Sequence, residues 1–248
     1  MDNCLTRVRR KNYGGVTMTA VIAHRGSAQQ ERENTIAAFL RAKECGADGV
    51  EFDVQMTVDE MLVIHHDAEI PDIGFISQLS SEALPPWIPT LSEALIACEG
   101  MSVNAEIKCF EEGNLGFKET IVERLVEVVH GADAPPDLLV SSFDHGVLAE
   151  VRRQAPSVAT GALIAPGRGI VSVLERLSSQ GISAVHPFVL SVLESDVTEA
   201  HRQGIEVNVW TVNGPDDLER MSNFGVDSVI TDDVQLARKV LKIGESNC

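Results

Sequence analysis

Short apolar runs with β-strand character alternate with amphipathic helical stretches from about residue 20 onward. Strands are expected at 21–24, 48–54, 61–66, 103–108, 137–142, 159–164, 183–187, 206–212 and 227–231. Helices are expected at 35–45, 91–98, 117–130, 145–154, 170–180, 194–203, 215–224 and 233–242. Repeated strand–helix units form parallel sheets with right-handed crossovers. The alternation therefore predicts an α/β fold, a closed (β/α)8 TIM barrel, with an open doubly wound sheet as the alternative.

The predicted strands outnumber those of such a barrel by one, and the spacing of two of them explains the excess. Six residues, 55–60, separate the run 48–54 from the run 61–66, and only about three of them, 58–60, turn the chain, which leaves no room for a helix. The two runs are therefore expected to form a β-hairpin at the second strand of the barrel. That hairpin sets residue 52 or 53 opposite residue 65 or 66 and returns His66 to the carboxylates of Glu51 and Asp53.

Composition and charge exclude several classes of partner. The 248 residues carry a formal net charge of −17, which disfavours nucleic acid and anionic membrane surfaces. The five cysteines are scattered, so reduced thiols and a cytoplasmic location are expected. No apolar stretch approaches the roughly 20 residues of a membrane span, so membrane insertion is not expected. We expect a flexible extension at 1–17 and a single barrel domain at 18–248, which is compatible with a homo-oligomer.

Carboxylates lie at the ends of two predicted strands. Glu51 and Asp53 share one face of a strand because side chains alternate with a period of two, and Glu106 and Lys108 do the same on the next parallel strand. Adjacent carboxylates repel each other unless a cation lies between them, and hard oxygen ligands suit Mg²⁺ or Ca²⁺, with Mn²⁺ also acceptable. Solvated strand ends and a simple ion pair at the barrel rim are the structural alternatives. A Schiff-base role for Lys108 is a functional one.

Two histidines and two aromatic residues also fall at strand ends. The run 21–23 is followed by His24 and Arg25, which combine a proton carrier with a fork-shaped phosphate ligand. His66 is a candidate general acid or a structural histidine. Phe143 and Trp210 would line the apolar side of a pocket or belong to the core. The carboxyl ends of barrel strands form the face on which active sites are built, so these groups are expected to converge there.

The combination of motifs resembles the glycerophosphodiester phosphodiesterase family, in order from about residue 20 to residue 240. The matching segments are Val-Ile-Ala-His24-Arg25-Gly26, Glu33-Asn34-Thr35, Glu51-x-Asp53, His66-Asp67, Glu106-Ile107-Lys108, Ser141-Ser142-Phe143, Trp210-Thr-Val-Asn213 and Ile230-Thr231-Asp232. The resemblance implies a TIM barrel that hydrolyses glycerophosphodiesters, which are small molecules, to glycerol 3-phosphate and an alcohol. It implies an acid/base pair of His24 and His66. It also implies one divalent cation on the three acids and phosphate contacts from Arg25 and Lys108.

Several points depart from the family or stay open. Arg32 replaces a proline that is usual before Glu33, and the insertion at 67–90 is short, with Phe75, Leu79 and Trp87 as its apolar content. Thr231-Asp232-Asp233 is expected to cap the last helix, without a catalytic role. Neither the roles of the two histidines nor the choice between attack by water and attack by the substrate's own glycerol hydroxyl is decided. The alternatives are a lipase on the same barrel, a barrel aldolase, a zinc amidohydrolase and a non-catalytic binding barrel.

Overall fold

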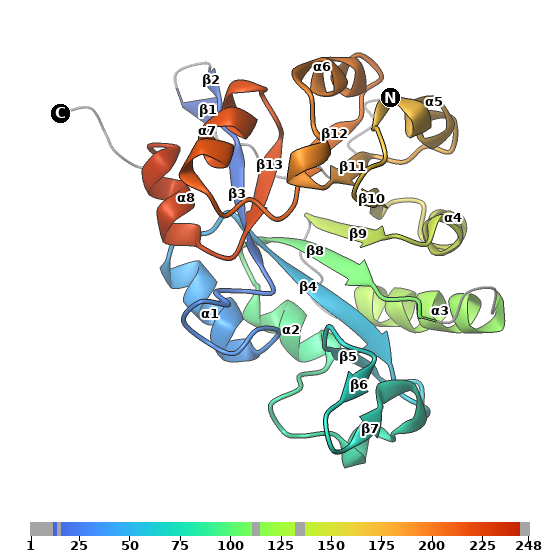
Figure 1. The fold of residues 1–248 in the computed structure, drawn as a ribbon. Coiled ribbons are helices and arrows are strands. Elements are labelled where there is room, and N and C mark those ends of the chain that lie inside the picture. Colours follow the sequence, from blue (N-terminus) through green and yellow to red (C-terminus); the bar gives the residue numbers. More distant parts are fainter. Residues whose placement is uncertain (1–11, 14–15, 111–114, 132–136, 244–248) are drawn as a thin grey trace.

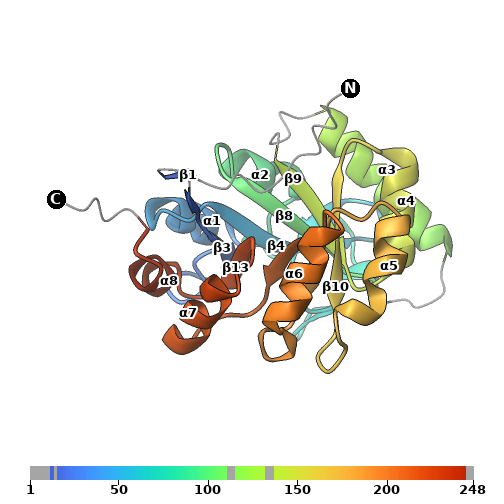
Figure 2. The ribbon, with the colours of Figure 1, turned by 90° about the horizontal axis from the view of Figure 1, so that it is seen from above.

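The computed structural model describes residues 12–13, 16–110, 115–131 and 137–243, and its main sheet closes on itself (Figures 1 and 2). The strands follow the order β3-β13-β12-β11-β10-β9-β8-β4-β5, and a further pairing joins β3 to β4. Every strand pairing in this sheet is parallel except that between β4 and β5, which leaves a closed barrel of eight parallel strands. The predicted TIM barrel is confirmed, and the open sheet is excluded.

The barrel strands and the helices lie within a few residues of their predicted positions. The barrel strands are β3 (Ala20–His24), β4 (Gly49–Met56), β8 (Ser102–Ile107), β9 (Leu138–Ser142), β10 (Ala159–Ile164), β11 (Ala184–Pro187), β12 (Glu206–Val209) and β13 (Ser228–Thr231). The helices are α1 (Ile36–Glu44), α2 (Leu91–Ala97), α3 (Leu115–Gly131), α4 (His145–Gln154), α5 (Val171–Ser179), α6 (Glu194–Arg202), α7 (Pro215–Asn223) and α8 (Val234–Val240). Figure 2 shows helices around the outside of the strands.

The principal core lies between the strands and these helices, and alternation along β4 shows how it forms. Phe52 faces outward and is fully buried, with its ring centroid 5.5 Å from that of Phe39 on α1. Burial of a side chain of this size contributes roughly 1.5–3 kcal/mol. The neighbours of Phe52 in the chain, Glu51 and Asp53, consequently face the interior of the barrel.

The short helix α2 begins at a capping box. The Thr90 hydroxyl accepts a hydrogen bond from the backbone N–H of Glu93, and the Glu93 carboxylate accepts one from the backbone N–H of Thr90. Two of the backbone donors left free at a helix start are thereby satisfied. The cap fixes where the chain re-enters the outer layer after the insertion.

The hairpin at the second strand is present. β5 (Leu62–Ile64) pairs antiparallel with the end of β4, with Val54 opposite Ile64. The backbone N–H of His65 then donates to the carbonyl of Asp53 at 2.9 Å, so residue 53 lies opposite residue 65 as the spacing predicts. The chain that follows β5 therefore leaves from the carboxyl end of the barrel.

The insertion after β5 has a small core of its own. It contains β6 (Glu69–Ile70), β7 (Gly74–Phe75), η1 (Ile76–Gln78) and η2 (Ser81–Ala83) and lies beside the carboxyl end of β4 (Figure 1). Its buried residues Ile70, Ile76 and Ile88 cluster with Val63 of β5, and Leu79, Leu84 and Trp87 pack against them. Phe75 does not join this core.

The predicted extension at 1–17 lies largely outside the described residues. Of its residues, Asn12–Tyr13 (β1) and Val16–Thr17 (β2) form a short antiparallel pair. After β11, η3 (Val189–Ser191) precedes α6. Across the part of the chain that the structure describes, no helix combines the length and apolar character needed to cross a membrane.

Candidate active site

The carboxyl ends of the barrel strands surround a cavity of about 230 Å³, here called the main cavity. Every site residue predicted from the sequence lines it except Asp53, which is buried beside it and only 1% exposed. The lining residues are His24, Arg25, Glu51, His66, Asn104, Glu106, Lys108, Phe143, Leu163, Trp210 and Ile230. Side chains from strands that are far apart in the sequence therefore meet where barrel enzymes carry their sites.

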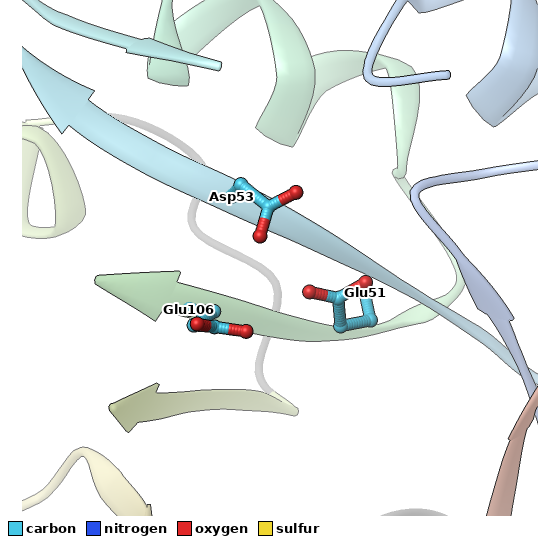
Figure 3. Close-up of side chains that lie close together, drawn as sticks. All are labelled: Glu51, Asp53 and Glu106. Carbon is cyan, nitrogen blue, oxygen red and sulfur yellow. The ribbon is translucent and has the colours of Figure 1, made fainter. Parts of the chain in front are cut away.

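Three buried carboxylates, here called the acidic cluster, lie together at this end of the barrel. Glu51 and Asp53 extend from β4 and Glu106 from β8, and Asp53 is directly opposite Glu106 in the strand pairing (Figure 3). One oxygen from each lies within 4.8 Å of the others. The two-residue periodicity that predicted this face is thus realised across two neighbouring strands.

Lys108 neutralises part of the acidic cluster. Its Nζ lies 2.9 Å from Asp53 Oδ1 and 2.6 Å from Glu106 Oε1. Burial lowers the pKa of Lys108, but these two carboxylates outweigh it and raise the pKa above its ordinary value. Burial likewise raises the pKa of Asp53, whereas the charges of Lys108 and Arg25 lower it, and the net pKa is low. Asp53 is therefore ionised, and Lys108 stays charged.

Glu51 and Glu106 are less well compensated. Burial, and then the charge of Asp53, raises the pKa of Glu51 to about 8. Burial also raises the pKa of Glu106 despite its contact with Lys108. In this arrangement the three carboxylates outnumber the two permanently charged side chains in contact with them, Lys108 and Arg25. A divalent cation with oxygen ligands fits this donor set, because it would satisfy the carboxylates that Lys108 and Arg25 leave incompletely neutralised.

Arg25 reaches the acidic cluster from a tight turn after β3. Both Arg25 and Gly26 have positive φ, 54° and 82° respectively. The turn points the backbone N–H of Arg25 at Glu51 Oε2, 3.1 Å away, and brings its Nε to 3.3 Å from Asp53 Oδ2. An atom at the Cβ position of Gly26 would lie 2.7 Å from the backbone of Ala38 on α1, so only glycine fits this close approach.

Two residues that fix these groups, Asn34 and Asp232, were not among the site residues predicted from the sequence. Asn34 donates from Nδ2 to Asp53 Oδ2 at 2.7 Å, from the loop before α1. Asp232 Oδ1 lies 2.6 Å from Nδ1 of His24, and its other oxygen accepts from the Asn213 amide at 2.6 Å. Asn34 and Asp232 both belong to the matched family motifs, and Asp232 follows a barrel strand. That position was a usable signal for a site role.

The segment Thr231-Asp232-Asp233 caps the last helix, as expected, and Asp233 is the residue that does so. Asp233 alone accepts from the backbone N–H of Leu236 at the start of α8. Asp232, one residue earlier, turns toward the barrel mouth. Burial lowers the pKa of His24, but its hydrogen bond with Asp232 and the charge of Glu51 more than offset this, and the pKa is raised.

His66 enters the main cavity from the hairpin. Its Nδ1 lies 2.7 Å from Asp67 Oδ1. The buried Gln55 amide donates to the carbonyls of His65 and Asp67, each at 2.7 Å, and holds this turn in place. His65 packs instead toward Trp87, with ring centroids 5.8 Å apart. His65 and His66 thus face opposite ways.

Phe143 and Trp210 form one wall of the main cavity. Their rings meet edge to face with centroids 5.7 Å apart, and Trp210 Nε1 donates to the His186 carbonyl at 2.7 Å. Phe143 remains 46% exposed. The pair is thus a cavity wall rather than part of the closed core.

Comparisons with known proteins agree over almost the whole chain. A family model, the glycerophosphoryl diester phosphodiesterase family, matches residues 24–236. A glycerophosphodiester phosphodiesterase of Caldanaerobacter subterraneus is 34% identical over 245 residues, which is 89% of this chain and 98% of the relative. Two solved structures are similar. An Oleispira antarctica phosphodiesterase in complex with the product sn-glycerol-3-phosphate has a TM-score of 0.81 at 28% identity, covering 91% of this chain and 97% of that one. A Parabacteroides distasonis glycerophosphodiester phosphodiesterase has a TM-score of 0.80 at 26% identity, covering 90% and 97%.

Proposed function

This chain belongs to the glycerophosphoryl diester phosphodiesterase family, and we propose that it hydrolyses glycerophosphodiesters to glycerol 3-phosphate and an alcohol with the help of one divalent cation. The observation that carries the proposal is the convergence of the buried acidic cluster, two cationic side chains and two histidines on the main cavity. These are the groups that phosphodiester hydrolysis requires.

The acidic cluster would hold the cation, with Glu51, Asp53 and Glu106 as its protein ligands. A bound divalent cation, Mg²⁺ or Ca²⁺ with Mn²⁺ as a further choice, supplies charge that stabilises a phosphoryl oxygen in the transition state. Asn34 orients Asp53 from behind, and the Arg25 backbone N–H orients Glu51. The ligands would therefore be held in place before substrate arrives.

Arg25 and Lys108 bind the phosphate in this proposal. Both cations already lie against the acidic cluster, so a phosphate placed in the main cavity lies within reach of each. As the phosphorus passes through its transition state, negative charge builds up on its oxygens and both side chains neutralise it. Phe143 and Trp210 would pack against the carbon skeleton of the glycerol.

His24 and His66 carry protons to and from the reacting oxygens. Each ring has Nδ1 engaged by a carboxylate, Asp232 for His24 and Asp67 for His66. Nε2 is then the nitrogen available to the substrate. One histidine takes the proton of the attacking water or glycerol hydroxyl, and the other donates a proton to the leaving alkoxide. Attack by water gives glycerol 3-phosphate directly, whereas attack by the glycerol hydroxyl gives a cyclic phosphate that water then opens to glycerol 3-phosphate. Each transfer is worth about 10²–10⁴ in rate.

Release of glycerol 3-phosphate from glycerophosphocholine and glycerophosphoethanolamine, with Mg²⁺, Ca²⁺ or EDTA, tests the activity directly. We expect release with a cation and little in EDTA, and loss of at least 100-fold in His24→Ala and His66→Ala. His130→Ala is the matched control, because this histidine is exposed near the end of α3. Absence of release under every condition would refute the proposed function. Full activity in either site variant would refute the acid/base pair.

A further inference from the structure

A second hollow of about 220 Å³, here called the side cavity, lies next to the main cavity. Lys108 lines both. Its apolar lining comes from Met56, Phe75, Phe110 and Phe117, that is, from the end of β4, the insertion, the segment after β8, and α3. A ligand held at Lys108 therefore has access to two hollows of similar size.

Phe75 faces the side cavity although an apolar core is available nearby. Ile70 and Ile76 on either side of it are buried in the core of the insertion, whereas Phe75 is 46% exposed. Phe110 lines the same hollow and is 54% exposed. Large aromatic side chains left open beside a reactive centre are typical of ligand contact rather than of folding.

The two hollows differ in chemistry. The main cavity presents polar groups that can bind hydroxyls, including His24, Arg25 and Asn104. No carboxylate is found among the described residues that line the side cavity. Met56, Ser77 and Phe117 also line a further hollow of about 260 Å³, which includes the Glu60 carboxylate in its lining and is therefore not counted as part of the side cavity.

We propose that the side cavity binds the leaving alcohol and selects alcohols with an uncharged alkyl portion. The inference rests on the proposed function, because it needs the phosphate at Arg25 and Lys108. The glycerol, which is rich in hydroxyl groups, then occupies the main cavity, and the other ester arm extends past Lys108 toward Phe75 and Phe110. A primary ammonium such as that of ethanolamine meets no carboxylate among the described lining residues and loses hydration on entering. An alkyl group gains from the same apolar surface.

A matched series of glycerol 3-phosphate esters tests this selection: methyl, n-butyl, ethanolamine and choline. A fully buried methylene is worth roughly fourfold in kcat/KM, or about 50-fold for the three additional methylenes of butyl. Because the hollow is open on one side, we expect the butyl ester to exceed the methyl ester by about tenfold or more and also to exceed both charged esters.

Variants of residues that line the side cavity test whether the preference for the butyl ester arises there. Phe75→Ser and Phe110→Ser are each expected to bring the butyl-to-methyl ratio of kcat/KM toward one, and the far-ultraviolet circular dichroism spectrum verifies the fold. Ile96→Ser, at an apolar residue on α2 that is 69% exposed and lies outside both cavities, is the control and keeps the wild-type ratio.

The outcomes distinguish failure of the proposed function from failure of the side-cavity inference. No release from any ester refutes the proposed function itself. Hydrolysis with equal kcat/KM for the methyl and butyl esters overturns the inference alone. A choline ester that exceeds the butyl ester also overturns it, in favour of a quaternary ammonium held on the aromatic rings.

Discussion

Replacement of Gly26 by alanine is expected to destabilise the fold and to disturb the phosphate-binding turn. Gly26 has a φ of 82°, a conformation that costs a residue with a Cβ roughly 1–2 kcal/mol. The new Cβ would also lie 2.7 Å from two atoms of Ala38 and 2.9 Å from a third. Two of these three atoms belong to the backbone of α1, which cannot rotate away, so overpacking adds roughly 1–3 kcal/mol. We expect Gly26→Ala to lower the free energy of unfolding by about 2–5 kcal/mol in total.

Gly204→Ala is the matched control for this variant. Gly204 has a φ of 74°, and nothing lies within 4 Å of its Cβ position, so its substitution carries the conformational cost without the clash. Urea unfolding of both variants and the wild type, followed by circular dichroism in EDTA, gives the comparison. EDTA removes any contribution from bound cations.

The difference between the two variants isolates the contact with α1. Gly26→Ala should cost about 1–3 kcal/mol more than Gly204→Ala, and its kcat/KM should fall, because the Arg25 backbone N–H moves away from Glu51. Equal losses of stability in the two variants would refute the reasoning. So would a Gly26→Ala protein with wild-type kcat/KM, because the turn would then tolerate displacement.

Three further predictions concern the carboxylates. Asp232→Asn should lower kcat by roughly 10- to 100-fold with little change in KM, because a hydrogen bond to a charged group contributes about 1.5–3 kcal/mol. An unchanged kcat in steady-state kinetics would contradict this. Millimolar Mg²⁺ or Ca²⁺ should raise the thermal midpoint of the wild type, because binding at 100 times the dissociation constant stabilises the native state by about 2.7 kcal/mol. The same cations should leave the thermal midpoint of the double variant Glu51→Gln, Asp53→Asn unchanged. A wild-type midpoint that no cation moves would count against the metal site. The pKa of Glu51 is about 8 in the native state without a cation, against an ordinary value of 4.5 in the unfolded chain. Between these pH values the native state therefore binds more protons than the unfolded state, and in EDTA the free energy of unfolding should fall as pH rises. Urea unfolding of Glu51→Gln should show a smaller decline over that range, and an identical decline would show that Glu51 does not titrate as described.

Local periodicity was sufficient to predict most of the fold and the acidic cluster. Alternation along a strand determines that Glu51 and Asp53 share a face, and parallel pairing brings Glu106 beside them. The short link at 58–60 leaves no alternative to a hairpin, and the hairpin carries His66 to the site. Each of these steps uses only neighbouring residues or neighbouring strands.

The contact between Asp232 and His24 depends on closure of the barrel, which local patterns do not report. The two residues are 208 positions apart, and they meet because β13 pairs with β3, with Thr231 opposite Ala23. In the sequence, Asp232 precedes Asp233 at the start of a helix, and both have the chemistry of an N-cap. Only the direction of the chain at the end of β13 decides that Asp233 caps the helix and Asp232 reaches the histidine.

The charge of the site explains how an acidic protein would bind an anionic substrate. The chain carries a net charge of −17, and within the site the acidic cluster outnumbers its two cationic partners, Arg25 and Lys108. Without a cation, the centre reduces its charge by keeping Glu51 protonated. A divalent cation would release that proton and still leave the centre net positive. Phosphate and cation should therefore bind cooperatively, and cation affinity should rise with pH as Glu51 ionises.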